Sequence, residues 1–298
     1  MQPPVETQSP RNLARYNIFT DPLFWTPRHL DAVGCRFEDH EALAMELPDN
    51  EHSSDGHQYL DQRSWLIEGS GLELNVERLA RSCAPLVKYY ALINILDCEE
   101  SPFERLGKGT PFFFRRQAVH RPNYTLFCRR RQHCEPKYQH LQWAIGYFNY
   151  TDIIRRRRKK LQPRQNPTGG HNAVGQRLFH KRLSQITPLE WAHDPYLFCV
   201  LLSIAQLQRQ SQDLHRQPAY ISRLLVTNSS DVEFLHIYEA QITFELLEWL
   251  DHPVTSAEFT GAPIIVKRKK LPFKPFGNFV RRIAYELLAN ENARMMSA

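Results

Sequence analysis

The sequence lacks the features by which several large classes of protein are recognised. It has no run of 18 or more apolar residues, so we expect no membrane span. Its first residues, MQPPVETQSPRNLARY, carry no apolar core, so we expect no secretory signal. It contains no G-x-S-x-G motif, phosphate loop, dinucleotide fingerprint or H-E-x-x-H motif, so the sequence predicts no catalytic residue of these classes.

The six cysteines show no spacing that indicates a disulfide framework or a metal site. Cys128 and Cys134, with His133 beside the latter, lack the second pair of ligands that a zinc finger or ribbon has. We therefore expect no cofactor and no metal. Reduced thiols are typical of a protein in the cytoplasm or the nucleus.

Acidic residues are nearly absent from the middle of the chain. Between Arg115 and Arg182 there are 17 lysines and arginines but only two acids, Glu135 and Asp152, which gives a net charge of +15. The whole chain has 38 basic and 32 acidic residues, so the remainder has a net charge of −9. A concentrated cationic segment between acidic flanks predicts an anionic partner, either a nucleic acid or an acidic protein.

The residues that we select as contacts with such a partner lie in two basic clusters. They are Arg129, Arg130, Arg131, Arg155, Arg156, Arg157, Arg158, Lys159 and Lys160. Aromatic residues are interleaved with basic ones in this region, and cations with stacking rings are the chemistry of single-stranded nucleic-acid binding. The alternative is that the aromatic residues belong to the core and the arginines are their solvated ends.

The longest basic run, Arg155–Lys160, has three interpretations. Six adjacent like charges repel one another, so we expect the segment to be extended and solvated. Such a run is typical of a nuclear import signal, of a nucleic-acid contact or of an ordinary surface loop.

The clearest secondary structure is predicted between His193 and Asp251. Asp194 and Pro195 begin a helix there, because an Asp side chain accepts hydrogen bonds from free amides and Pro suits the first helical position. The first three turns are apolar on nearly every side, which predicts a buried helix. From Gln206 the helix becomes polar, and we expect it to emerge into water.

Strands and further helices follow this segment. Residues 219–227 and 232–242 are rich in branched and aromatic side chains, and the turn residues 228–231 between them predict an antiparallel hairpin. Thr243 begins a short helix, and residues 262–273 form another strand.

An amphipathic helix is predicted before the buried one, over residues 174–186. We expect its apolar residues to face the core; they are Val174, Leu178, Phe179, Leu183 and Ile186. Together, the order of elements predicts an α+β protein, with a small, mainly antiparallel sheet covered by helices mainly on one face.

Three regions are predicted along the chain. Residues 1–60 are poorly defined and partly disordered, and residues 61–170 form a basic, aromatic-rich segment. The second region ends in the flexible break Asn166–Gly170, and residues 171–292 form a compact α+β unit.

Three stretches carry a resemblance to other proteins. DPYLFCVLLSIAQLQRQ, LLVTNSSDVEFLHIYEAQITFELLEWLDHP and LPFKPFGNFVRRI together resemble a group of conserved, uncharacterised proteins from filamentous fungi. The resemblance covers about Ala173–Leu288. It implies a fungal intracellular protein and carries over no activity.

The sequence favours a non-catalytic binding or interaction protein that uses a basic central surface. Two alternatives remain open, an accessory protein of a fungal biosynthetic pathway and a metal-dependent nuclease-like enzyme. In the latter, Asp231 and Glu239 would hold Mg²⁺ and Lys267 would activate water. Gln241 stands where such a motif has lysine, and Glu239 suits the solvent face of a strand equally well. The oligomeric state is not predicted.

Overall fold

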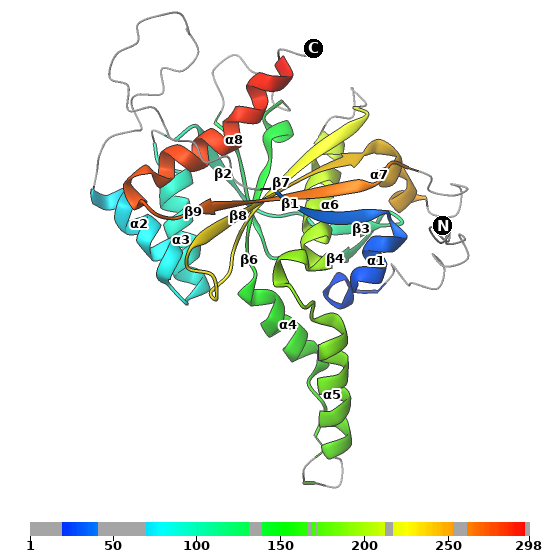
Figure 1. Cartoon of the computed structure of the whole chain (residues 1–298). Coiled ribbons are helices and arrows are strands. Elements are labelled where there is room, and N and C mark those ends of the chain that lie inside the picture. Colours follow the sequence, from blue (N-terminus) through cyan, green and yellow to red (C-terminus); the bar gives the residue numbers. More distant parts are fainter. Residues whose placement is uncertain are drawn as a thin grey trace, which may run out of the picture.

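A computed structural model shows the chain built around one seven-stranded sheet (Figure 1). The structure describes residues 20–40, 70–99, 101–130, 139–165, 169–170, 172–211, 217–252 and 261–295. Most of the region predicted to be poorly ordered, residues 1–60, lies outside these ranges. Residues 20–40 are folded and contain α1 (Pro27–Ala32) and the first strand of the sheet.

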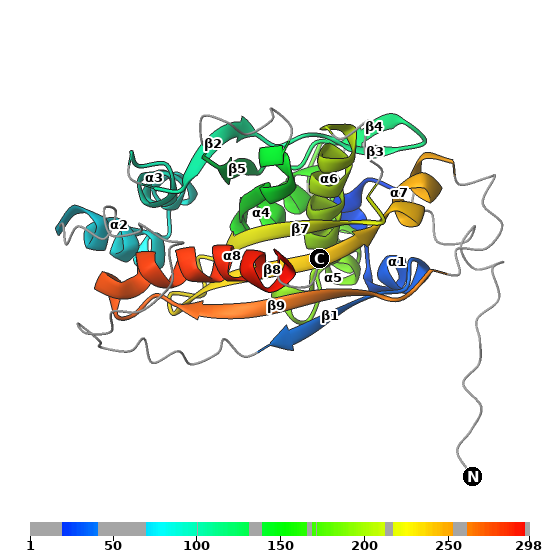
Figure 2. The same cartoon turned by 90° about the horizontal axis from the view of Figure 1, so that it is seen from above.

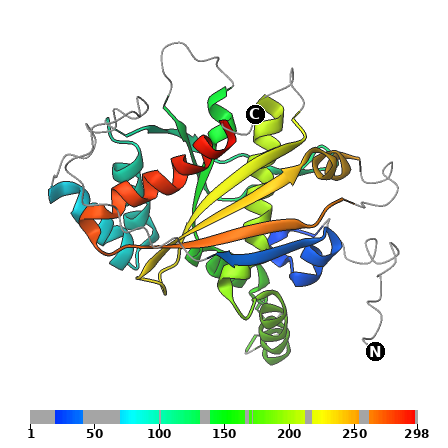
Figure 3. The same ribbon diagram turned by 45° about the horizontal axis from the view of Figure 1, so that its top comes forward.

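The sheet has the strand order β1-β9-β8-β7-β6-β5-β2. Two neighbouring pairs, β1 with β9 and β6 with β7, are parallel, and the other four pairs are antiparallel (Figure 3). The α+β class with a mainly antiparallel sheet is therefore confirmed. The strands of this sheet are β1 (Cys35–His40), β2 (Phe103–Lys108), β5 (Thr125–Arg129), β6 (Ile145–Asn149), β7 (Ala219–Thr227), β8 (Phe234–Thr243) and β9 (Ile264–Pro272). A separate two-stranded hairpin consists of β3 (Phe112–Phe114) and β4 (Gln117–His120).

The predicted hairpin is the antiparallel pair β7 and β8. Its register runs from Ala219 opposite Thr243 to Val226 opposite His236. In the turn, the amide of Asp231 donates to the carbonyl of Asn228, as the short polar residues there favour. Thr243 then caps the next helix by accepting a hydrogen bond from the amide of Leu246.

Helices cover both faces of the sheet, whereas the sequence predicted coverage mainly on one. One face packs against α6 (Pro195–Ser211) and α7 (Phe244–Asp251). The other face packs against α2 (Ser70–Arg81), α3 (Pro85–Leu96) and α8 (Phe279–Met295), and α8 lies in front of β8 in Figure 2. The alternation of strand side chains explains the two cores, since Leu224 and Tyr238 face α6 while Leu225 and Ile237 face α8.

Helix α6 remains buried past the point where its sequence becomes polar. The prediction that it emerges into water from Gln206 is wrong, because Gln206 and Gln208 are both buried. The Gln206 amide accepts from the Phe113 backbone nitrogen at 2.9 Å and donates to the Phe113 carbonyl at 2.7 Å. Gln208 donates to the carbonyls of Gln142 and Ile221. Polar side chains are thus held inside by backbone partners that only the tertiary structure supplies.

The predicted boundary at Asn166–Gly170 does not divide the sheet. Strand β6, from the predicted region 61–170, pairs in parallel with β7, from the predicted unit 171–292. A parallel pair needs a crossover connection. Here the crossover holds α4 (Thr151–Leu161), α5 (Ala173–Ile186) and α6. In Figure 1 α4 and α5 extend away from the sheet, while α6 returns to it.

Candidate nucleic-acid interface

The basic run Arg155–Lys160 is helical, so the prediction of an extended segment is wrong. It belongs to α4, which begins directly after β6. The Asn149 side chain accepts a hydrogen bond from the amide of Thr151 at 3.0 Å, which satisfies one free donor of the first turn. Arg and Lys are good helix formers, and a helix turns their side chains to different sides.

Arg157 is separated from the rest of the run by burial. It is 1% exposed, and its Nη2 lies 2.9 Å from Asp194 Oδ1 while its Nε donates to the Leu23 carbonyl at 2.7 Å. Tyr150 donates to the same carboxylate at 2.8 Å. Burial alone would lower the pKa of Arg157, but Asp194 holds it above its usual value. Arg157 therefore anchors α4 to the body, and the prediction that it is a surface contact is wrong.

The second predicted cluster, Arg129–Arg131, lies apart from α4, on and after β5. Arg130 donates to the backbone carbonyls of Cys98, Ser101 and Phe103 at 2.9–3.1 Å, so its guanidinium is used inside the protein. Arg129 is half-buried, and Arg131 lies outside the described residues. The structure thus does not unite the eight described residues among the nine predicted contacts in one surface.

Most of the described aromatic residues in and just before the cationic segment belong to the core. Those that are buried are Phe112, Phe114, Tyr124, Phe127, Tyr147, Phe148 and Tyr150. They are not available to stack on bases, so the alternative interpretation of the interleaved pattern holds for them. Single-stranded binding uses base stacking, so these buried aromatic residues give that interpretation no support.

The exposed basic residues gather instead on α4, α5 and the described residues between them, which we call the basic arm. Residues 151–186 contain ten lysines and arginines and one acid, Asp152. Eight of the ten are exposed: Arg155, Arg158, Lys159, Lys160, Arg164, Arg177, Lys181 and Arg182. The arm stands away from the sheet in Figure 1, so these side chains surround a projection from the body.

Helix α5 gives the arm its length but buries none of its own residues. The Asn172 side chain caps it by accepting from the Gly175 amide at 2.8 Å, and a Cβ at Gly175 would meet that side chain at 2.5 Å. Val174 and Leu178, predicted to face the core, are 63% and 49% exposed. That prediction is wrong because α5 packs on α4 and leaves the sheet to α6.

The base of the arm is held by a second set of ion pairs. Asp21, before α1, bonds Lys160 of α4 and lies 3.0 Å from Nδ1 of His120. His120 Nε2 lies 2.9 Å from the hydroxyl of Tyr196, a residue in the first turn of α6. Burial alone would raise the pKa of Asp21, but the hydrogen bonds from His120 and Lys160 hold it well below its usual value.

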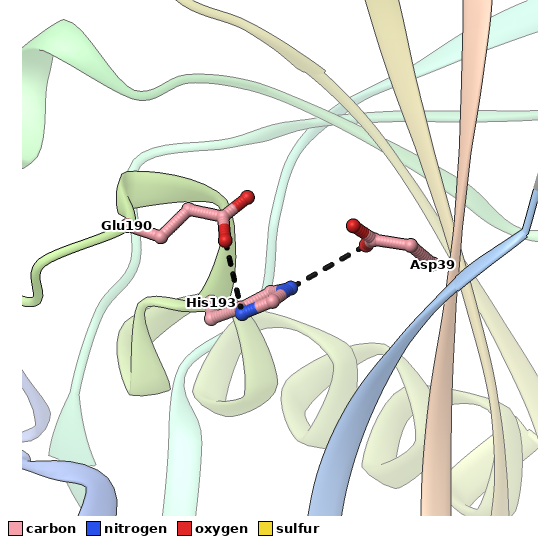
Figure 4. A group of neighbouring side chains, drawn as sticks. All are labelled: Asp39, Glu190 and His193. Carbon is pink, nitrogen blue, oxygen red and sulfur yellow. Dashed lines mark hydrogen bonds and ion pairs between the residues drawn. The ribbon is translucent and has the colours of Figure 1, made fainter.

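A group of titratable residues joins the segment between α5 and α6 to strand β1. Asp39, Glu190 and His193 each offer one ligand atom, and these atoms lie within 4.8 Å of one another. Figure 4 shows His193 between the two carboxylates, with Nε2 3.4 Å from Asp39 Oδ1 and Nδ1 3.5 Å from Glu190 Oε2. Carboxylates with an imidazole are ligand types that divalent metals accept.

Arg268, on β9, binds both carboxylates of this group. Its guanidinium bonds the second oxygen of each carboxylate, Asp39 Oδ2 and Glu190 Oε1, the latter at 2.9 Å. Both carboxylates thus already bind a cation, and the positive charge of Arg268 repels a divalent ion at the same place. We therefore assign the group to a ring of ion pairs that ties the base of the arm to β1 and β9. Burial would raise the pKa of Asp39, but Arg268 and His193 hold it below its usual value.

The two carboxylates of the nuclease-like alternative do not meet. Asp231 lies before β8, where its Oδ2 is 2.7 Å from Nε2 of His236. Glu239 lies within β8, five residues or roughly 16 Å of extended chain beyond the first residue of that strand. It accepts from Arg223 at 2.8 Å, on the face of the sheet that α8 covers. A shared Mg²⁺ needs both carboxylates within a few ångströms, so this arrangement gives the alternative no support.

Comparisons of the chain with protein families, with curated proteins and with solved structures give no match. Within the described residues, no helix has the length and apolar character that crossing a membrane requires.

Proposed function

We propose that the protein is a non-catalytic binding protein that contacts nucleic acid through its basic arm. The observation that carries the proposal is the concentration of eight exposed cations against one acid on the basic arm, which extends from the body. Closely spaced phosphates are the anions that such a surface neutralises best, because each contact releases condensed counterions.

The pairing of the arm's cations supports this proposal further. Arg155 pairs with Asp152 at 2.8 Å and Lys160 with Asp21. Within the described part of the chain, no ion pair is recorded for Arg158, Lys159, Arg177, Lys181 or Arg182. An anion that binds these cations would relieve their mutual repulsion.

The stability of α5 leads to the same conclusion. Most helical stability in proteins comes from packing an apolar face, and α5 buries none of its residues. A bound polyanion would add the contacts that α5 lacks. The proposal includes an intracellular location in nucleus or cytoplasm and a fungal source, both of which rest on the sequence alone.

The test is a fluorescence-anisotropy titration of the full chain with labelled oligonucleotides, between about 50 and 200 mM salt. Affinity should fall steeply with salt. The variant Arg158→Ala/Lys159→Ala/Arg177→Ala/Lys181→Ala should bind weakly, and the slope of log affinity against log salt should flatten by up to about 3 to 4.

A matched control removes four exposed cations from the body: Lys108→Ala/Arg121→Ala/Lys267→Ala/Arg281→Ala. It has the same net charge as the arm variant, so it should bind nearly as the wild type does if the arm is the contact. Equal losses in both variants would assign binding to net charge and overturn the arm as the site. Absence of wild-type binding at low salt would overturn the proposal altogether and leave an acidic protein as the partner to seek.

A further inference from the structure

The outer face of α5 combines two kinds of exposed side chain. Arg177 and Lys181, four residues apart, lie on one side of the helix and are both exposed. Val174 and Leu178 follow the same spacing and lie beside them, 63% and 49% exposed. Phosphate contacts need only the cations. The apolar pair therefore indicates that the partner also presents apolar groups at the depth that α5 reaches.

The dimensions of α5 suit a groove rather than a flat surface. Its 14 residues span about 21 Å, and a helix with its side chains is about 10–12 Å wide. The major groove of B-form DNA is about 12 Å wide and admits one helix. It also presents the C5-methyl groups of thymine, the apolar groups on base edges that Val174 and Leu178 would contact.

Other nucleic acids fit this face less well. The major groove of an A-form RNA duplex is too narrow for side chains to read. Single strands are held by aromatic stacking, but of the two ring-bearing residues of α5, Phe179 is half-buried and the ring of His180 already lies edge-on to it at 5.1 Å between centroids. The charge and shape of α5 therefore favour one class of ligand.

We propose that the ligand is double-stranded DNA and that α5 lies in its major groove, with the cations of α4 on the flanking phosphates. This inference rests on the proposed function of the basic arm. Val174 and Leu178 contact thymine methyl groups, and Arg177 and Lys181 contact the phosphates along one side of the groove.

The test compares duplexes of about 20 base pairs, two helical turns, made of DNA or RNA with the same A·T-rich sequence. A third duplex carries deoxyuridine in place of thymidine and so differs only by the missing methyl groups. Wild-type protein should prefer DNA to RNA. It should bind the deoxyuridine duplex about four-fold more weakly for each methyl group that Val174 or Leu178 would otherwise bury.

Two variants locate the apolar interaction with the methyl groups. Val174→Ser/Leu178→Ser should bind the thymidine and deoxyuridine duplexes equally. Leu189→Ser, a change at a fully exposed leucine outside the arm, should keep the wild-type difference. Both sites are exposed, and circular dichroism checks that each variant is folded.

The outcomes separate the two proposals. If RNA binds as tightly as DNA, or if removal of the thymine methyls changes nothing, the major-groove inference fails. In that case, loss of binding in the variant with four arm cations replaced by alanine would still support the proposed function. If no duplex binds the wild type at low salt, the major-groove inference fails. The proposed function then also fails unless single-stranded oligonucleotides bind the wild type and lose affinity in the arm variant.

Discussion

Helices α5 and α6 follow one another in the chain and have opposite relations to the protein. Thirteen of the seventeen residues of α6 are buried, and none of the fourteen residues of α5 is. Both helices carry apolar residues at helical spacing. The difference is that α6 lies on the sheet, whereas α5 packs on α4 and projects from the body. Helical periodicity thus identifies a helix, but the presence of a surface to cover decides whether its apolar face becomes core.

The same contrast occurs within one run of like residues. Arg157 and Arg158 are neighbours in α4, yet Arg157 is buried against Asp194 while Arg158 is exposed. One arginine therefore belongs to the stability of the body and the other to the surface of the arm.

Arg157→Ala should lower the free energy of unfolding by about 3–5 kcal/mol, because it leaves the Asp194 carboxylate buried and unpaired. Arg158→Ala should change it by no more than about 0.5 kcal/mol. Urea unfolding of both variants measures the difference. The double variant Arg157→Met/Asp194→Leu should recover part of the loss, since it removes both charges but leaves the Tyr150 hydroxyl and the Leu23 carbonyl without their partners. Equal effects of the two single changes would contradict the division between anchor and surface.

Leucine truncation compares the two helices directly. Leu201→Ala in α6 should cost about 2–5 kcal/mol, because Leu201 is fully buried and its removal leaves a cavity. Leu178→Ala in α5 should cost no more than about 0.5 kcal/mol, since its side chain is half exposed. Thermal or urea unfolding provides the comparison. A large loss in Leu178→Ala would show that the outer face of α5 is covered in solution.

Acid should affect the body through Asp231. Burial alone would raise the pKa of Asp231, but hydrogen bonds from His236 and from the amides of Glu233 and Phe234 hold it below the ordinary 3.8. The unfolded chain therefore takes up the proton at a higher pH than the folded protein. The stability that Asp231 contributes is present above about pH 4 and is lost as pH falls through the lowered pKa.

Asp231→Asn should consequently reduce stability by about 1–2 kcal/mol at neutral pH, because it removes the charge-assisted hydrogen bonds. It should also flatten the loss of stability below about pH 4. Urea midpoints at a series of pH values measure both effects. Parallel pH profiles of the variant and the wild type would contradict the assigned role of Asp231.

Local sequence was sufficient where an element carries its own signals and also lies on the sheet. The start of α6 at Asp194 and Pro195, the β7–β8 hairpin and the Thr243 cap were predictable for this reason. The apolar run of α3 suits a strand or a helix equally, so its local sequence does not decide between them. Its Lys88 is buried and donates to the carbonyls of Leu79 and Ala80 at the end of α2, contacts that no periodicity indicates.

The candidate interface was only partly predictable. The concentration of positive charge in the middle of the chain is a property of the sequence, and it pointed to an anionic partner. The assignment of Arg130 and Arg157 to internal bonds is not, since their acceptors include the carbonyl of Cys98 and the carboxylate of Asp194, 32 and 37 residues away. Nothing in the local pattern separates Arg157 from the exposed arginines beside it.

The sequence by itself determined the α+β class, the central hairpin, the buried start of α6 and the charge of the middle segment, because these depend on side-chain types and short spacings. Tertiary structure alone decided which arginines are exposed, which aromatic residues fill the core and that α4 and α5 form an arm. These outcomes depend on long-range partners and on the area of sheet left to cover, since α6 covers the face that α5 would otherwise need.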